Sequence, residues 1–373
     1  MLYLCLDRFS QGDFMTTARQ DIFAKDRNER YHISCRCVQK AWLLGTDPDT
    51  GNDYNHRKDW IPDKLKFYQK IFCIDLGAYA VMDNHFHIII ENRIDLANKL
   101  TDKEIVFRWL LLHPTREAKK AKRVEPTSDE INEKLITLDL EKTRQRLCDI
   151  SWYMKEFNWS IAYRANREMN RKGKFFEARF NCQYLADDAA VLTCMIYVDL
   201  NVIRARAAKS VEESVFTSAH DRSVADLAMK NLETFSAIQP ATLTLTYPQE
   251  QEIKNQIELV KNHHWLAPLK SDVSSDLKPF LNITLDKYLD LLDYTGRAYH
   301  KDKPGIIPGT IAPILMAMDL NHNLWMASIK NYGSWFYRVV GPLLKLKDKL
   351  IAVKQRWFKG VKLNENLFKP LLN

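Results

Sequence analysis

The chain has 373 residues, of which 46% are hydrophobic and 27% are charged, and its formal net charge is +8. This composition is typical of a folded globular protein and excludes a largely disordered chain, while 11 glycines and 13 prolines are too few for a collagen-like protein. The length suits two domains, or one large domain with additions. No apolar stretch reaches the roughly 20 residues of a membrane-spanning helix. Asp7 and Arg8 stand where a secretory signal needs its apolar run, so secretion is not expected.

The seven cysteines are scattered, and several lie inside apolar runs. This pattern indicates buried thiols in a reducing cytoplasm rather than a disulfide framework. Cys35 and Cys37 would share one face of a strand. A zinc site needs further ligands, and no second cysteine pair is present, so two strand cysteines are the favoured interpretation.

The first half of the chain predicts an antiparallel α+β pattern. Residues 1–28 form an irregular N-terminal extension, and residues 31–38 read as a strand. Apolar spacing predicts a helix over 59–72. The strand-like runs 74–82 and 85–90 are separated by Asp83 and Asn84, which predicts a β-hairpin or one bent strand.

Helices dominate the remainder. We expect a helix over 104–112, an exposed charged stretch over 119–132 and a broken helix over 135–170. One buried stripe is predicted in the last of these, comprising Trp152, Met154, Phe157, Ile161 and Ala165. A short strand within 175–185 and a helix over 187–207 follow. The sequence pattern changes near residue 210, where polar stretches mix with short helical patterns, and we place a domain boundary there. Residues 211–280 read as an irregular helical linker that includes a helix over 250–261, and residues 281–373 as a basic helical region with helices over 285–299 and 343–358.

The pair His85 and His87 is the sharpest chemical feature. In a strand, residues i and i+2 face the same side, so the two imidazoles project together. That arrangement offers two ligands to a metal ion. The alternative is a partly exposed strand that carries two histidines without a ligand.

A second feature lies in the helix predicted over 187–207. Tyr197 and Asn201 are spaced i and i+4, which places them on one face, one turn apart. A phenol can attack phosphorus, and an amide oxygen can bind a hard cation. Arg204 and Arg206 follow and suit a nearby phosphate. Taken alone, however, the segment is also what an ordinary amphipathic helix would show.

Positive charge is concentrated in two segments. Residues 161–180 hold six basic and two acidic residues, and residues 341–373 hold eight basic and two acidic residues. Such clustering is expected of a nucleic-acid-binding surface, although most charge runs are simply solvated helix faces. The basic residues of the first segment are Arg164, Arg167, Arg171, Lys172, Lys174 and Arg179. The chain lacks the phosphate-binding loop of ATP and GTP hydrolases, the dinucleotide fingerprint and the nucleophile elbow of α/β-hydrolases.

In combination, these features resemble the single-tyrosine HUH transposases, and within them the REP-associated tyrosine transposase group. The similar segments are YHISCRCVQKAWLLG, AYAVMDNHFHIII, FFEARFNCQYLADDAAVLTCMIYVDLNVIRA and, more loosely, LDKYLDLLDYTGR. The resemblance implies a transposase domain over 29–210 with a ferredoxin-like antiparallel sheet that carries the histidines on a central strand. It also implies a DNA partner, a monomer or homodimer, and a cytoplasmic, nucleoid-associated protein with no membrane contact.

The resemblance further implies a mechanism. Tyr197 would attack a phosphate of single-stranded or hairpin DNA, form a 5′-phosphotyrosine and free a 3′-OH. His85 and His87 would hold Mg²⁺ or Mn²⁺, with Asn201 as the third ligand.

Two departures from the family pattern stand out: Val202 where proline often follows the asparagine, and Phe175–Phe176 in place of a Phe-Trp pair. Tyr163 and Tyr184, both near basic residues, are rival nucleophiles. A domesticated protein that binds DNA hairpins with little or no catalysis is the main alternative, and a structural metalloprotein is a weaker one.

Overall fold

The computed structural model describes residues 23–177, 179–205, 213–238, 246–270, 278–299, 310–352 and 360–368. Residues 1–22 of the predicted N-terminal extension, the side chain of Arg206 and part of the helix predicted over 343–358 lie outside the described residues. The strands are β1 (Arg30–Arg36), β2 (Ile74–Val81), β3 (His85–Asn92), β4 (Asn181–Leu185), β5 (Leu269–Lys270), β6 (Leu281–Thr284) and β7 (Val339–Val340).

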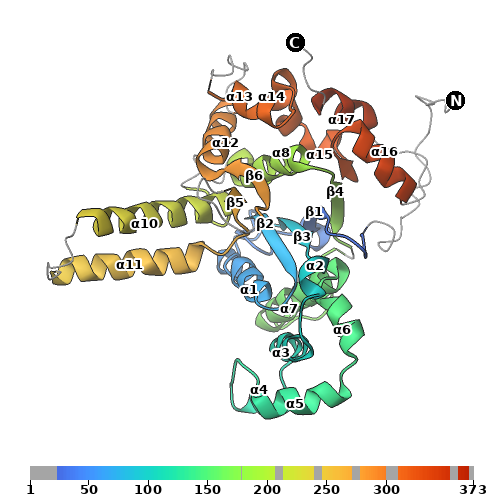
Figure 1. Ribbon diagram of the computed structural model, residues 1–373, viewed down its shortest axis with the longest axis vertical. Helices are drawn as coiled ribbons and strands as arrows, with labels where there is room; N and C mark the ends of the chain where they lie inside the picture. The colour runs from blue at the N-terminus through green and yellow to red at the C-terminus, as the bar shows by residue number, and fades with distance from the viewer. Residues whose placement is uncertain are drawn as a thin grey trace.

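Helices fill the intervals between the strands, and the fold is α+β (Figure 1). Those before β4 are η2 (Val38–Lys40), η3 (Asn55–Arg57), α1 (Trp60–Gln69), α2 (Ile94–Ala97), α3 (Asp102–Leu112), α4 (Arg116–Lys120), α5 (Ser128–Thr137), α6 (Leu140–Leu147) and α7 (Ile150–Glu168). Those after it are α8 (Asp188–Asp199), α9 (Asn201–Arg204), α10 (Ser218–Ile238), α11 (Tyr247–His263), α12 (Leu285–Tyr299), α13 (Ala312–Ala317), α14 (His322–Lys330), α15 (Tyr332–Trp335), α16 (Leu343–Ala352) and α17 (Val361–Leu367). None of the described helices is long and apolar enough to cross a membrane.

The central sheet has five strands in the order β2-β3-β1-β4-β7. The pairs β2–β3, β3–β1 and β1–β4 are antiparallel, and the short β7 pairs parallel with β4. β2 and β3 form the predicted hairpin across Asp83 and Asn84. Because β3 lies between β1 and β2, its residues are covered on both edges.

The two faces of this sheet are buried in two different cores. Alternate residues of β1 and β3, among them Ile33 and Phe86, pack against α1 and α7. This core contains Cys35 and Cys37, so both thiols are buried on one face. Cys35 is the predicted strand cysteine, whereas Cys37 lies just beyond the end of β1 and forms an isolated bridge with Phe176. The predicted stripe of α7 belongs to it, with Trp152 only half-buried at its edge. The opposite face carries Ile89 of β3 and packs against α8.

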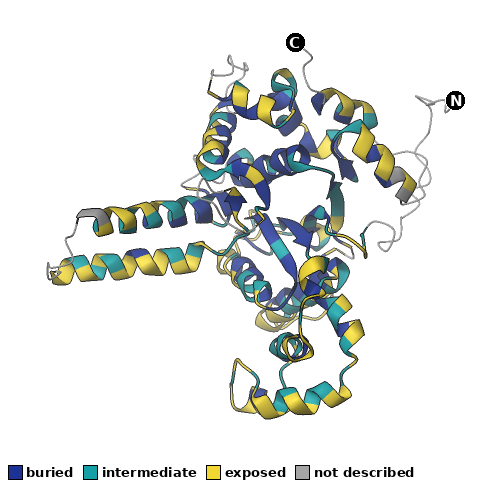
Figure 2. Cartoon of the chain, viewed as in Figure 1, coloured by how far each residue is buried: buried dark blue, intermediate teal, exposed yellow. Residues whose placement is uncertain are grey.

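Helix α8 lies between the sheet and the C-terminal helices. All its residues from Ala189 to Ile196 are buried, and a helix that is apolar on every side needs cover on every side. Side chains of α12, α14 and α15, such as Tyr288, Trp325 and Tyr332, share its core. Figure 2 shows this continuous buried layer, which spans both sides of residue 210.

The segment after residue 210 contains a long helical hairpin. α10 and α11 run side by side and project away from the sheet, with mostly exposed residues toward their tips (Figures 1 and 2). Arg222 anchors the base, because its Nη2 donates to the carbonyls of Gly77 (2.8 Å) and Ala267 (2.9 Å). The predicted helix over 250–261 is the centre of α11, whereas α10 was not predicted.

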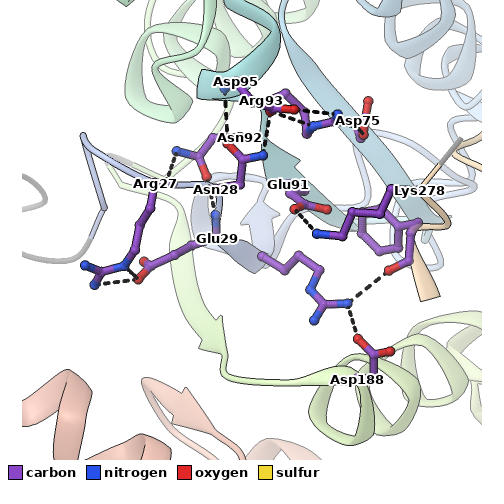
Figure 3. A network of polar contacts seen from close by, with 12 residues as sticks. Arg27, Asn28, Glu29, Asp75, Glu91, Asn92, Arg93, Asp95, Asp188 and Lys278 are labelled. Carbon is purple, nitrogen blue, oxygen red and sulfur yellow. Dashed lines mark hydrogen bonds and ion pairs between the residues drawn. The ribbon is translucent and has the colours of Figure 1, made fainter. Parts of the chain in front are cut away.

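Polar contacts hold the start of β1 in place (Figure 3). The side chain of Asn28 accepts from the backbone N–H of Ile94 at 2.9 Å, and the side chain of Asn92 accepts from that of Glu29 at 2.7 Å. Arg30 reaches across to α8 and donates to Asp188 at 2.7 Å and to the carbonyl of Phe280 at 3.0 Å. These contacts fix the register of β1 against β3, which the site described below requires.

Candidate active site

His85 and His87 project from β3 on the face that packs against α8. Phe86 between them points into the opposite core, as period-2 alternation requires. The two imidazole centroids are 5.0 Å apart. His87 is 7% exposed, and His85 is half-buried at the start of the strand. The predicted shared face is therefore present.

A chain of hydrogen bonds determines the tautomer of His87. Gln183 donates through Nε2 to the carbonyl of Phe336 at 3.0 Å, so its Oε1 faces His32 Nδ1, at 2.6 Å. Because that oxygen only accepts, His32 donates from Nδ1 and leaves its Nε2 as an acceptor. His87 Nδ1, 2.8 Å from this Nε2, must then donate. The result is a neutral His87 whose Nε2 carries a free lone pair.

His85 reaches the same state through its neighbour. Its Nδ1 lies 2.6 Å from Oδ1 of Asn84, which accepts a hydrogen bond from Nδ1–H and leaves Nε2 without a proton. Burial, and then the charge of Arg36, lowers the pKa of His85 to about 4. Burial also lowers the pKa of His32 to about 4. Burial and the surrounding positive groups hold the pKa of His87 well below its usual range. All three imidazoles are thus neutral at pH 7, the form that binds metal ions.

Tyr197, in the last turn of α8, lies against two of these histidines. Its ring centroid is 6.0 Å from that of His87 and 6.2 Å from that of His32. Tyr332 of α15 stacks on its other side, with centroids 4.3 Å apart, and the guanidinium of Arg204 lies 4.7 Å from the ring centroid. The phenol is therefore positioned by four separate segments of the chain: β1, β3, α9 and α15.

A break in the predicted helix falls immediately before Asn201. The predicted continuous helix over 187–207 is two helices, because α8 ends at Asp199 and α9 begins at Asn201. Leu200 between them has φ −81° and ψ −5°, which keeps the path close to helical. Asn201 is 9% exposed, and its buried Nδ2 has no hydrogen-bond partner. An unsatisfied buried N–H donor is costly, and an acceptor such as a phosphate oxygen would offset that cost, whereas a cation would bind the amide oxygen instead.

The donors fit a hard divalent cation with a partly open coordination shell. Within the described ranges, no cluster of three or more His, Cys, Asp or Glu side chains could hold a metal ion. An ion here would therefore take two imidazole nitrogens, with oxygen ligands from Asn201, water or a substrate phosphate. Mg²⁺ keeps several waters and substrate oxygens in this way.

The basic residues divide between two locations. Arg204 lies beside Tyr197, whereas Arg164 and Arg167 lie on α7, across the sheet from α8. Arg171, Lys172, Lys174 and Arg179 follow in the loop before β4. All six basic residues of the segment 161–180 are exposed, as a surface that binds phosphates requires.

The rival tyrosines lie elsewhere. Tyr184 packs into the core on the opposite face, where its ring is 5.8 Å from that of Tyr31. Tyr163 is 55% exposed on α7. Tyr332, which the sequence did not single out, lies against His32, with ring centroids 6.2 Å apart, but burial holds its pKa well above the usual value of a tyrosine. Among the tyrosines that the structure describes, Tyr197 thus combines contact with His87 and partial access to solvent.

Comparison with known proteins adds little. No protein-family model matches the chain, and no curated protein does. A solved structure of a REP-associated tyrosine transposase bound to a REP hairpin is similar at 11% sequence identity and a TM-score of 0.29. The match covers 58% of this chain and 86% of that chain. A TM-score of this size does not establish a common fold.

Proposed function

We propose that the chain is a metal-dependent transposase that nicks and rejoins single-stranded or hairpin DNA through a 5′-phosphotyrosine at Tyr197. One observation carries the proposal: a half-buried tyrosine packs against His87, and His87 shares a strand face with His85, each of the two imidazoles having a free Nε2 lone pair. The strand order and the placement of α1 and α7 on one face support a ferredoxin-like core.

The chemistry follows from these groups. The Tyr197 phenol gives up its proton to solvent, and its oxygen forms a bond to phosphorus. The bond from phosphorus to the 3′ oxygen breaks, and that oxygen takes up a proton to become a free 3′-OH. Attack by a 3′-OH on the phosphotyrosine reverses the step and rejoins the strand. Because the phosphodiester bond is exchanged rather than hydrolysed, the reaction needs no nucleotide hydrolysis.

His85 and His87 would hold the divalent cation, with Asn201 as the third ligand. When bound, Mg²⁺ or Mn²⁺ supplies Lewis-acid stabilisation of charge on the scissile phosphate. Arg204 beside the phenol adds a fixed positive charge to the same region. A protein that binds hairpins without cutting them would share the fold and the charge, so only a covalent product separates the two functions.

The test is Tyr197→Phe, incubated with labelled single-stranded DNA and manganese. Removal of a nucleophile lowers the rate by several orders of magnitude, far beyond the effect of a lost hydrogen bond of about 1 kcal/mol. We expect the native protein to form a covalent peptide–DNA adduct on Tyr197, identified by mass spectrometry, and the variant to bind DNA without forming it.

Tyr184→Phe is the matched control, because it removes a hydroxyl from the opposite face. His85→Ala with His87→Ala should also abolish the adduct. An adduct on Tyr163 or Tyr184, or binding without any adduct in the native protein, would refute the assignment of Tyr197.

A further inference from the structure

Two large aromatic side chains on α7 stand in solvent. Trp159 and Tyr163 are 63% and 55% exposed and lie one helical turn apart. Their rings stack, with centroids 5.2 Å apart and an angle of 16° between planes. The α7 core uses neither ring. Adjacent exposed aromatic side chains form an apolar patch, and such patches commonly mark interaction sites, whereas single exposed hydrophobic residues do not.

Tyr163 also borders a groove of 510 Å³ that is lined by His56, Trp60, Tyr163, Arg164, Arg167 and Glu168. Arg164 lies over the Trp60 ring, with its guanidinium 3.9 Å from the centroid. The groove thus combines aromatic faces with cationic groups.

The carboxylate of Glu168 does not cancel this charge. It accepts a hydrogen bond from Arg57 at 3.1 Å, and the Arg57 side chain is fully buried. The charge of this buried guanidinium neutralises that of Glu168. The charges of Arg164 and Arg167 therefore give the groove a net positive charge. Three further exposed cations, Arg171, Lys172 and Lys174, extend the positive charge along the next loop.

That loop leads toward the candidate active site. After Lys174 the chain runs beside the end of β1. There the backbone N–H of Val38 donates to the carbonyl of Phe175 at 3.0 Å, and the backbone N–H of Glu177 donates to the carbonyl of Arg36 at 2.8 Å. Arg36 in turn pairs with His85 across the sheet. A strand of DNA that followed these cations would run from α7 to the end of β3 that carries His85.

We propose that Trp159, Tyr163 and the adjoining groove form a second DNA site, which stacks unpaired bases and binds backbone phosphates through Arg164 and Arg167. This inference takes its ligand class from the proposed function and adds a site away from Tyr197. Stacking on aromatic side chains tolerates any base sequence, and a duplex hides the base faces that it needs. The site therefore favours unpaired DNA that flanks the cleaved position.

The test compares Trp159→Ala with Tyr163→Ala, made together, against Tyr247→Ala. Tyr247 is 73% exposed on α11 and controls for loss of an exposed aromatic. Affinities are measured for three DNAs of equal length: oligothymidine, an abasic phosphodiester chain and a duplex. Loss of stacking should weaken oligothymidine binding about tenfold or more. Binding of the abasic chain and the duplex should change little. Changing Arg164 and Arg167 to Gln should weaken oligothymidine and the abasic chain alike.

Unchanged oligothymidine affinity in the double variant would overturn the inference, as would an equal loss for all three DNAs. Either result would leave the Tyr197 adduct as an independent observation. Conversely, a native protein that binds oligothymidine through this site but forms no adduct would refute the proposed function alone. A native protein that binds none of the DNAs would refute both.

Discussion

His32 and Gln183 act on the candidate metal ligand rather than on a substrate. Together they hold the proton of His87 on Nδ1 and leave Nε2 free. Partners of this kind commonly change metal affinity 10–100-fold when removed. We expect His32→Ala to weaken Mn²⁺ binding by about that factor. The measurement is titration with Mn²⁺ followed by paramagnetic resonance.

The control for this variant is His264→Ala, because His264 is exposed near the end of α11. Gln183→Glu offers a second readout: the carboxylate still accepts from His32 but loses the donation to the Phe336 carbonyl, so this variant should lower the affinity less than His32→Ala does. Equal Mn²⁺ affinity in native protein and His32→Ala would show that the hydrogen-bond chain plays no part in binding.

The sequence alone singled out His85, His87 and Tyr197, because each was chosen from a short-range spacing: i and i+2 in a strand for the histidines, and i and i+4 in a helix for Tyr197. Two residues apart in a strand means one face, and this held for the histidines. His32, Gln183 and Tyr332 required more: His32 opposes Gln183 only through the β1–β4 register, and Tyr332 arrives from a segment far along the chain. No local pattern encodes such contacts. One signal was available for His32: its position in the strand places it on the face opposite Cys35 and Cys37, the face that carries His85 and His87.

Gly77 interrupts β2 at a bulge where the pairing with β3 shifts. A Cβ at this position would lie 2.0 Å from the Phe280 ring, so no larger residue fits without movement. Phe280 is buried, and its carbonyl accepts from Arg30. We expect Gly77→Ala to lower the free energy of unfolding by about 1–3 kcal/mol through overpacking. Urea unfolding measures this loss.

A double-mutant cycle with Phe280→Ala separates overpacking from any other effect of the substitution. With the ring removed, the methyl group added by Gly77→Ala has space, so this substitution should cost much less in that background. Additive losses would mean that the clash with Phe280 is not the cause.

The elements that the sequence predicted well are those with a single clear period. The β2–β3 hairpin and α12 match their predicted ranges closely. The predicted helix over 187–207 was wrong in being continuous, because α8 ends at Asp199 and α9 begins at Asn201. The side chain of Asp199 lies at the start of α10. It accepts from Ser218 and from the backbone N–H of Ala219 at 3.1 Å. α10 was missed because only its base is buried, so its outer turns carry no apolar stripe.

Positive charge in the C-terminal region serves more than one purpose. Lys349 of α16 is 5% exposed and lies 2.6 Å from the buried carboxylate of Glu29. An ion pair so deeply buried is a structural contact, because breaking it leaves an unpaired charge. Net charge over 341–373 therefore overstates the number of cations available to DNA.

The same region also completes the core around Tyr197. β7 pairs with β4, Phe336 accepts from Gln183, and Tyr332 stacks on the phenol. α8 shares its core with Trp325 and Leu315. The predicted boundary near residue 210 stays a prediction, and shortening the chain tests it. Each large apolar side chain that loses its cover costs about 1.5–3 kcal/mol. A handful of them would remove the roughly 5–15 kcal/mol that stabilises a typical domain.

We therefore expect a chain ended at residue 210 to lose cooperative thermal unfolding and to expose apolar surface, and it should bind no metal. Circular dichroism during heating and binding of a hydrophobic dye measure the first two properties. A chain ended after residue 352 is the matched control, since it lacks α17 but keeps β7, α15 and Lys349. It should unfold cooperatively at a lower temperature. If the shorter chain also unfolds cooperatively near the native temperature, then residues 29–210 form a domain that folds alone. The contacts of α15 with Tyr197 would then belong to the site rather than to the core.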